Sequence, residues 1–504
     1  MEPALLLAGG PLMTPDRDRS TAGPRIVGAS WVLTATDDRL ELVRDHEVVI
    51  DRGVIADVRP ATDPRGSDDR IWLEGHLLLP GFISGHSHIG ALSSTRGYVE
   101  SNPRTRRGRN FLHTMELLEE LTDDERDALT AANVLGMLRG GCTTHVEMSL
   151  SLKQMQSYVR VARRYGVRGY PSAMVPGMHR IMELWGADQH VLRAAAAETE
   201  TEIALAVDFA ASIEDDLLRP MMAVGTSAAH TPETIRQVRE AAERFHGVQI
   251  HLQAGFTGGP TGTDEQFRRV WGNDEVPWLA ALGLFDPGTP VFGAHCLGLE
   301  LERDLDLLPR DNFTYVNSPS ATGGGVSPGI APWPEMLAAG VNTSIGIDAH
   351  SADYLENIKL AVMYGRARTD FLVDRSAVAM DRPSIWTALH AATIGAAAGL
   401  ERRDLGRLVP GARADLCSID VVGAPHGVGV VPPEPLNLLL YANGLSVRNV
   451  LTEGVWQLRD GEFVFDDVAE VINTAGRINA RIWERLEAED FFVEVPREDR
   501  LEPR

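Results

Sequence analysis

Eight short apolar runs alternate with helical stretches between about residue 80 and residue 350, and this alternation limits the possible folds most strongly. The runs are rich in Val, Ile and Phe and are bounded by glycine or proline, as strands are. The stretches between them, such as "DDERDALTAANVLGMLRG" and "PETIRQVREAAERFHG", are rich in Ala, Glu and Arg. Strands that alternate with helices build parallel sheets, so the pattern predicts an α/β protein with a (β/α)8 TIM barrel over residues 80–400. The predicted strands are 81–88, 141–149, 166–175, 221–228, 247–253, 290–296, 312–318 and 341–350.

A doubly wound open sheet is the structural alternative to a barrel. Such a sheet often carries a phosphate-binding glycine fingerprint on its first strand-to-helix turn. The runs "GGCTT" and "TGGGVSPG" are rich in glycine but have no lysine in the required position. The barrel is therefore the preferred reading.

Residues on both sides of the barrel have a different pattern. Short Val- and Ile-rich runs separated by Gly and Asp fill 25–79 and return in 401–470, which predicts one small β-sandwich built from both segments. Residues 1–24 are expected to form an N-terminal extension. Residues 471–504 are expected to form a C-terminal helix and a charged tail.

Composition excludes several classes of partner. The formal net charge of -23 makes binding to nucleic acid or to an anionic membrane unexpected, and the one short basic run, 102–110, is interpreted as a solvated loop near the active site. Three widely spaced cysteines fit neither a disulfide framework nor a zinc-finger spacing. The N-terminal apolar patch is too short to span a bilayer and lacks a basic segment before it. We expect a cytoplasmic protein that acts on a small molecule.

Histidines and one aspartate stand at the ends of the predicted strands. His86 and His88 are two residues apart, so their side chains share one face of a strand. His251, His295 and Asp348 end the fifth, sixth and eighth strands, and the carboxyl ends of barrel strands surround the active site. A single histidine at a strand end is as often structural as functional. The whole set predicts a site for Zn²⁺ or Fe²⁺, with Asp348 able to accept a proton from water and His295 able to orient that water or polarise the substrate.

The motifs "LLLPGFISGHSHIG", "GVQIHLQAG", "FGAHCLGL" and "AAGVNTSIGIDAH" together resemble the amidohydrolase superfamily, in the branch of cytosine and guanine deaminases and triazine hydrolases. The resemblance covers almost the whole chain and implies a homo-oligomer. It implies that the metal ligands are His86, His88, His251 and Asp348, with His295 on the substrate side. Binuclear members carry a bridging lysine on the fourth strand. The segment "GVRGYPSAMVPG" has none, which implies one divalent ion, Zn²⁺ first and Fe²⁺ or Mn²⁺ as alternatives.

The sequence departs from that branch at Ala254. Deaminases of the branch have a glutamate three residues after the fifth-strand histidine, and alanine cannot transfer a proton. Glu147 is the candidate for the missing proton carrier, with a strand-end carboxylate paired with a nearby Arg as its structural alternative. His145, Gln253 and Asn317 are candidate substrate contacts.

These observations lead to a functional expectation with two alternatives. We expect a metal-dependent hydrolase that cleaves an amide, carbamate, urea or cyclic-imine C–N bond by means of a metal-activated water. A heteroaromatic deaminase or chlorohydrolase is the first alternative. A lyase or isomerase on the same metal site is the second.

Overall fold

The computed structural model describes residues 25–62, 69–95, 109–253, 262–309, 311–324, 330–372, 379–423, 429–430, 434–465 and 467–488. The proposed extension 1–24, most of the basic run 102–110, Ala254 and the tail beyond 488 lie outside these ranges. No described helix is both long enough and apolar enough to cross a membrane.

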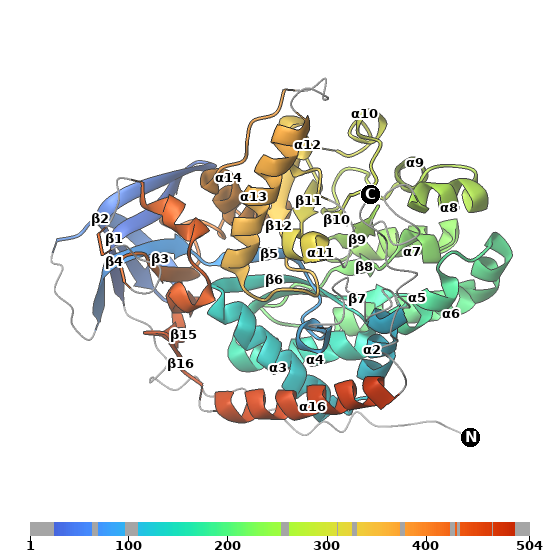
Figure 1. Ribbon diagram of the computed structural model, residues 1–504, viewed down its shortest axis with the longest axis horizontal. Helices are drawn as coiled ribbons and strands as arrows, with labels where there is room; N and C mark the ends of the chain where they lie inside the picture. The colour runs from blue at the N-terminus through green and yellow to red at the C-terminus, as the bar shows by residue number, and fades with distance from the viewer. Residues whose placement is uncertain are drawn as a thin grey trace, which may run out of the picture.

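The eight apolar runs form eight parallel strands in sequence order, which confirms the barrel (Figure 1). Each is short and buried on both faces, as strands of a parallel sheet covered by helices are. The strands are β5 (Phe82–Ser87), β6 (Cys142–Ser149), β7 (Arg168–Val175), β8 (Met222–Val224), β9 (Val248–Leu252), β10 (Val291–His295), β11 (Phe313–Asn317) and β12 (Asn342–Ile345).

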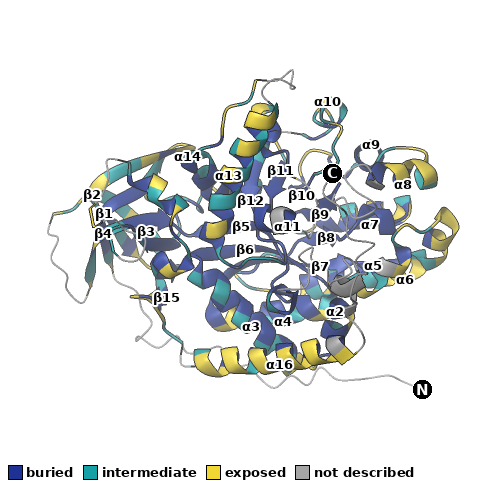
Figure 2. Ribbon diagram, viewed as in Figure 1, coloured by how far each residue is buried: buried dark blue, intermediate teal, exposed yellow. Residues whose placement is uncertain are grey.

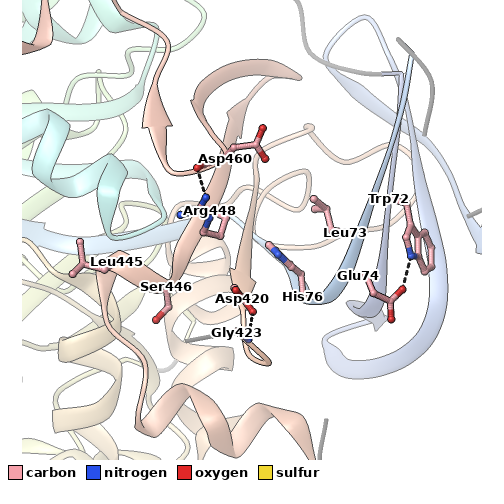
Figure 3. A pocket seen from close by; sticks show the side chains of 10 residues that line it. All are labelled: Trp72, Leu73, Glu74, His76, Asp420, Gly423, Leu445, Ser446, Arg448 and Asp460. Atoms are coloured by element: carbon pink, nitrogen blue, oxygen red, sulfur yellow. Dashed lines mark hydrogen bonds between the residues drawn. The ribbon is translucent and has the colours of Figure 1, made fainter. Parts of the chain in front are cut away.

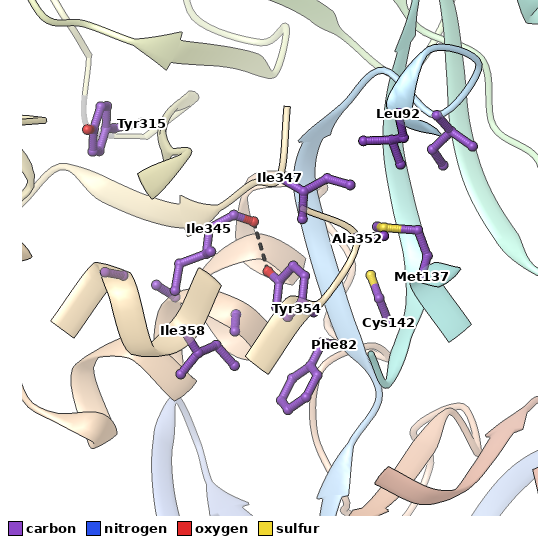
Figure 4. Packing of buried hydrophobic residues seen from close by; sticks show 14 of the residues in the cluster. Phe82, Leu92, Met137, Cys142, Tyr315, Ile345, Ile347, Ala352, Tyr354 and Ile358 are labelled. Atoms are coloured by element: carbon purple, nitrogen blue, oxygen red, sulfur yellow. Dashed lines mark hydrogen bonds between the residues drawn. The ribbon is translucent and has the colours of Figure 1, made fainter. Parts of the chain in front are cut away.

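Contacts between β5 and the end of β12 close the barrel. Ser87 and Asp348 form a parallel bridge, and the Ile347 N–H donates to the His86 carbonyl at 2.9 Å. The Tyr354 hydroxyl lies 2.8 Å from the Ile345 carbonyl (Figure 4). It also lies 2.7 Å from the Ile83 carbonyl, so one buried side chain links the two strands. This closure brings the histidines of the first strand beside the aspartate that follows the last.

Helices surround the barrel, and the predicted helical stretches fold as helices. The helix that begins after Thr122 has a capping box, in which Thr122 and Glu125 satisfy each other's backbone N–H. The helices are α1 (Leu92–Thr95), α2 (Arg109–Glu119), α3 (Asp123–Arg139), α4 (Leu152–Tyr165), α5 (Met178–Leu184), α6 (Gln189–Ala211), α7 (Pro232–Ala242), α8 (Gly262–Trp271), α9 (Glu275–Ala281), α10 (Leu301–Asp304), α11 (Pro319–Gly324), α12 (Trp333–Ala338), α13 (Tyr354–Leu372), α14 (Ile385–His390) and α15 (Ala396–Gly399).

The two ends of the chain form one mixed eight-stranded sheet beside the barrel (Figure 1). The C-terminal β13 pairs with the N-terminal β4, so the two segments are one structural unit. Its order is β16-β15-β14-β13-β4-β1-β2-β3, with β1 (Ile26–Thr36), β2 (Arg39–Asp51), β3 (Val54–Pro60), β4 (Arg70–Pro80), β13 (Leu416–Asp420), β14 (Val447–Thr452), β15 (Val455–Arg459) and β16 (Glu462–Phe463).

A final helix, α16 (Val468–Ala488), packs along α3 and leaves its outer face exposed (Figure 2). Its apolar side chains at helical spacing, Ala475, Ile478 and Ile482, are buried. The Asn479 side chain accepts a hydrogen bond from Ser94 at 2.7 Å. The helix therefore covers the side of the barrel formed by its first helices.

Candidate metal centre

Four imidazoles and one carboxylate meet at the carboxyl end of the barrel. His86 and His88 lie at the end of β5, His251 and His295 lie in β9 and β10, and Asp348 follows β12. All five are at most 5% exposed. Two overlapping sets have ligand atoms within 4.8 Å of one another: His86 with His251 and His295, and His86 with His88 and Asp348. The structure thus brings together residues that are as many as 262 positions apart (348 − 86).

The distances between these atoms fit one metal ion. His251 Nε2 lies 3.1 Å from His86 Nε2 and 3.2 Å from His88 Nε2. Asp348 Oδ1 lies 3.5 Å from His88 Nε2, and its other oxygen lies 3.5 Å from His295 Nε2. Ligand nitrogens 2.0–2.1 Å from a tetrahedral zinc are about 3.3 Å apart. Three imidazoles and a carboxylate are also a ligand set that zinc, iron or manganese accepts.

The other ring nitrogen of two of these histidines bonds to the protein backbone. His88 Nδ1 lies 2.5 Å from the Met148 carbonyl, and His251 Nδ1 lies 2.7 Å from the Gly225 carbonyl. A carbonyl only accepts, so both rings carry their proton on Nδ1 and present Nε2 to the shared point. The sequence gives no signal for these two orienting groups, because they are backbone atoms.

Burial keeps the imidazoles neutral. It lowers the pKa of His86 and His251 well below the usual value of 6.5, and the neighbouring rings lower it further. Burial likewise lowers the pKa of His88 and His295, although Asp348 opposes the shift. Neutral imidazole is the form that binds a metal.

The backbone is unusual where two of these residues stand. His295 has φ 76° and Asp348 has φ 58°, in a region that non-glycine residues seldom occupy. Such conformations cost of order 1–3 kcal/mol and cluster at functional sites. They turn both side chains toward the shared point at the end of their strands.

The structure does not bring Glu147 and His145 together with the imidazoles. Val146 belongs to one buried apolar cluster with residues of four other barrel strands and so faces the barrel interior, which places its neighbours in β6 on the outer face. His145 Nδ1 lies 3.1 Å from the Tyr158 hydroxyl of α4. The Glu147 carboxylate accepts hydrogen bonds from Ser87 and Ser149, and burial raises its pKa to about 8.

Two other candidates are buried at strand ends. Gln253 donates through its side chain to Asp264 at 2.6 Å, and its N–H donates to Glu275 at 2.9 Å. The bond to Asp264 directs the Gln253 side chain toward α8 rather than toward the imidazoles. Asn317 ends β11, and its buried Oδ1 has no partner among the described residues. Its role as a substrate contact stays a prediction.

Neither of the chain's two lysines lies on a barrel strand. The segment "GVRGYPSAMVPG" proves to be the third barrel strand, β7, and the fourth is β8, which carries no lysine either. The sequence contains only Lys153 and Lys359, which lie in α4 and α13. No barrel strand can therefore supply a bridging lysine.

Comparison with known proteins places these features in one family. The Amidohydrolase family matches residues 77–456, which include every residue of the cluster. The chain belongs to the amidohydrolase family. It is therefore a hydrolase that acts on C–N bonds of small molecules, with a divalent metal in the cluster.

Relatives span most of this amidohydrolase. A 5-methylthioadenosine/S-adenosylhomocysteine deaminase from Natronomonas pharaonis is 29% identical over 455 residues, which cover 89% of this chain and 96% of that protein. A zinc-bound adenosine deaminase from Xanthomonas campestris has a TM-score of 0.74 at 20% identity, covering 92% of this chain and 99% of that one. A zinc-bound atrazine chlorohydrolase from Arthrobacter aurescens has a TM-score of 0.73 at 19% identity, covering 90% and 99%. These likenesses confirm the branch expected from the motifs.

A separate cavity of about 390 Å³ lies in the smaller sheet domain (Figure 3). Its carboxylates are used within the fold. Glu74 accepts from the Trp72 indole at 2.8 Å, and Asp420 accepts from the N–H groups of Val422 and Gly423. It contains none of the ligand candidates, so we assign the chemistry to the barrel.

Proposed function

We propose that this amidohydrolase hydrolyses a C–N bond at one metal ion held by His86, His88, His251 and Asp348. The single observation that carries the proposal is the convergence of their ligand atoms. The absence of a strand lysine supports one ion rather than two. Zinc is the proposed ion, since imidazole and carboxylate suit it and two structural relatives hold it.

The chain's own residues divide the chemistry between them. A divalent ion held by these residues would lower the pKa of a bound water from about 15.7 to about 7. Asp348 would accept the proton from the attacking water and pass it to the departing amine. His295, 3.5 Å from Asp348, is neutral and buried, so it orients the water or hydrogen-bonds the substrate.

The substrate class follows from the proton path. Ala254 offers no proton carrier, and Glu147 lies on the outer face of β6. A route that uses Asp348 alone suits amides, carbamates, ureas and cyclic imines, whose leaving nitrogen needs one proton. Deamination of an adenine-like ring is the second candidate, because relatives matched over 86–97% of their own length are named 5-methylthioadenosine/S-adenosylhomocysteine deaminase or 5′-deoxyadenosine deaminase.

A substrate panel tests the proposal. Anilides, carbamates, ureas, aminopyrimidines and 5′-deoxyadenosine are incubated with zinc-loaded protein in ¹⁸O water. We expect turnover of the first three classes with ¹⁸O in the product. Asp348→Asn should lower kcat by about 10²–10⁴-fold, the range of general acid–base catalysis.

The matched control is Asp420→Asn, the same change in the smaller domain, which should keep the parent rate. Turnover confined to aminopyrimidines or nucleosides would replace the first substrate class by the second. A product without ¹⁸O would point to a lyase or an isomerase. Homo-oligomeric assembly and a cytoplasmic location remain part of the proposal.

A further inference from the structure

A side chain on the outer face of β6, Glu147, binds the end of β5 next to the ligand candidate His88. Glu147 is fully buried, and both its oxygens accept from the Ile89 N–H, at 3.1 and 3.0 Å. One of them also accepts from the Ser87 hydroxyl at 2.8 Å, and the other from Ser149 at 3.1 Å. The carboxylate therefore binds the residues on both sides of His88.

These hydrogen bonds lie where the regular pairing of β5 with β6 ends. Ser87 and Glu147 are the last backbone pair between β5 and β6, so His88 and Ile89 lie beyond the regular sheet. The next residue of β6, Met148, accepts from His88 Nδ1 through its carbonyl. Two consecutive residues of β6 thus fix the main chain around His88 and the orientation of its ring.

The chemistry of the partners calls for a carboxyl group, which has two oxygens. An N–H can only donate, and both oxygens of Glu147 lie within hydrogen-bond distance of the same N–H. An amide in this position would have only one oxygen to offer and would turn its NH₂ toward a donor. The Ser87 and Ser149 hydroxyls can either donate or accept a hydrogen bond, whereas the Ile89 N–H can only donate one.

We infer that Glu147 is a positioning residue, which holds His88 at the metal by fixing Ser87 and Ile89. The inference rests on the metal site of the proposed function and deepens it. It replaces the proton-transfer role that the sequence suggested for Glu147. Removal of groups that orient metal ligands typically costs 10–100-fold in metal affinity.

Zinc release tests this role without any substrate. The zinc-loaded parent, Glu147→Ala, Glu147→Asp and Glu147→Gln are mixed with a chromogenic chelator, and the rate of zinc transfer is recorded. We expect Glu147→Ala to release zinc at least tenfold faster than the parent. Glu147→Asp, which keeps the carboxyl group and loses reach, should also be fast. Glu147→Gln, which keeps the reach and one acceptor, should recover part of the retention.

Tyr158→Phe is the matched control, because it removes a buried hydrogen bond to the same face of β6, at His145. It should lower the thermal midpoint of the metal-free protein while zinc release stays at the parent rate. Parent-like release from all three Glu147 variants would overturn the inference alone. If Glu147→Ala does not fold, a parent-like rate in both Asp and Gln variants has the same meaning. A parent protein that takes up no zinc would overturn the proposed function together with this inference.

Discussion

At the scale of single residues, buried titratable groups with shifted pKa values surround the metal centre. His86, His88, His251 and His295 have lowered pKa values, so the unfolded chain binds more protons than the folded protein below pH 6.5. Burial raises the pKa of Glu275 to about 8, so the folded protein binds the extra proton between about pH 4.5 and 8. The two kinds of group therefore make stability depend on pH in opposite directions.

We predict that the metal-free protein is most stable near pH 6.5. Below this pH the free energy of unfolding falls by about 1.4 kcal/mol per pH unit for each histidine that stays neutral. Between pH 6.5 and about 8, stability falls because Glu275 and Glu147 keep their protons in the folded protein and are ionised in the unfolded chain. Urea unfolding between pH 5 and 9 checks this, with Glu275→Gln expected to reduce the slope on the alkaline side. Stability that rises steadily from pH 6.5 to 8.5 would contradict the assignment.

The sequence identifies the residues that converge in the cluster but not every neighbour of them. Two histidines at i and i+2 share a face of any strand, and that prediction held for His86 and His88. The face of β6 could not be predicted, since a parallel strand is buried on both sides and has no alternation of polar and apolar residues. Val146 and Met148 look no more internal than His145 and Glu147 until the neighbouring strands are in place.

At the scale of elements, the barrel and the smaller sheet are joined by a buried ion pair. Arg168 begins β7, and its guanidinium lies 3.0 Å from Asp415 and 2.9 Å from Glu453. The Arg168 side chain is 1% exposed. Asp415 also accepts from the Glu453 N–H, at 2.7 Å, so the charges are fixed by further bonds. Removal of the arginine would leave a buried carboxylate without its cation.

We predict that Arg168→Met lowers the free energy of unfolding by about 3–5 kcal/mol, as loss of one partner of a buried pair does. Asp415→Asn added to it should restore part of the loss, because the uncompensated charge is gone. Arg163→Met removes an ion pair with Asp215 at the surface and should cost less than about 1 kcal/mol. Equal effects of the two arginine substitutions in urea denaturation would contradict this account.

At the scale of the whole molecule, the alternation of strands and helices was enough to predict the barrel. The eight predicted runs became β5 to β12 because each is short, apolar and bounded by turn residues. The order of strands in the smaller sheet could not be predicted, since β4 and β13 are more than 330 residues apart in the sequence, with the whole barrel between them. The docking of α16 on α3 could not be predicted either, because it depends on matching surfaces rather than on local sequence.

The measurement that tests the central claim most directly is the metal content of the purified protein. It is determined by mass spectrometry for the parent, His86→Ala and Asp348→Ala, with circular dichroism to confirm that each is folded. We expect about one equivalent of zinc or another divalent ion in the parent and a large loss in both variants, as for one site with shared ligands. Two equivalents in the parent, or no metal in folded protein even after zinc is added, would contradict the account.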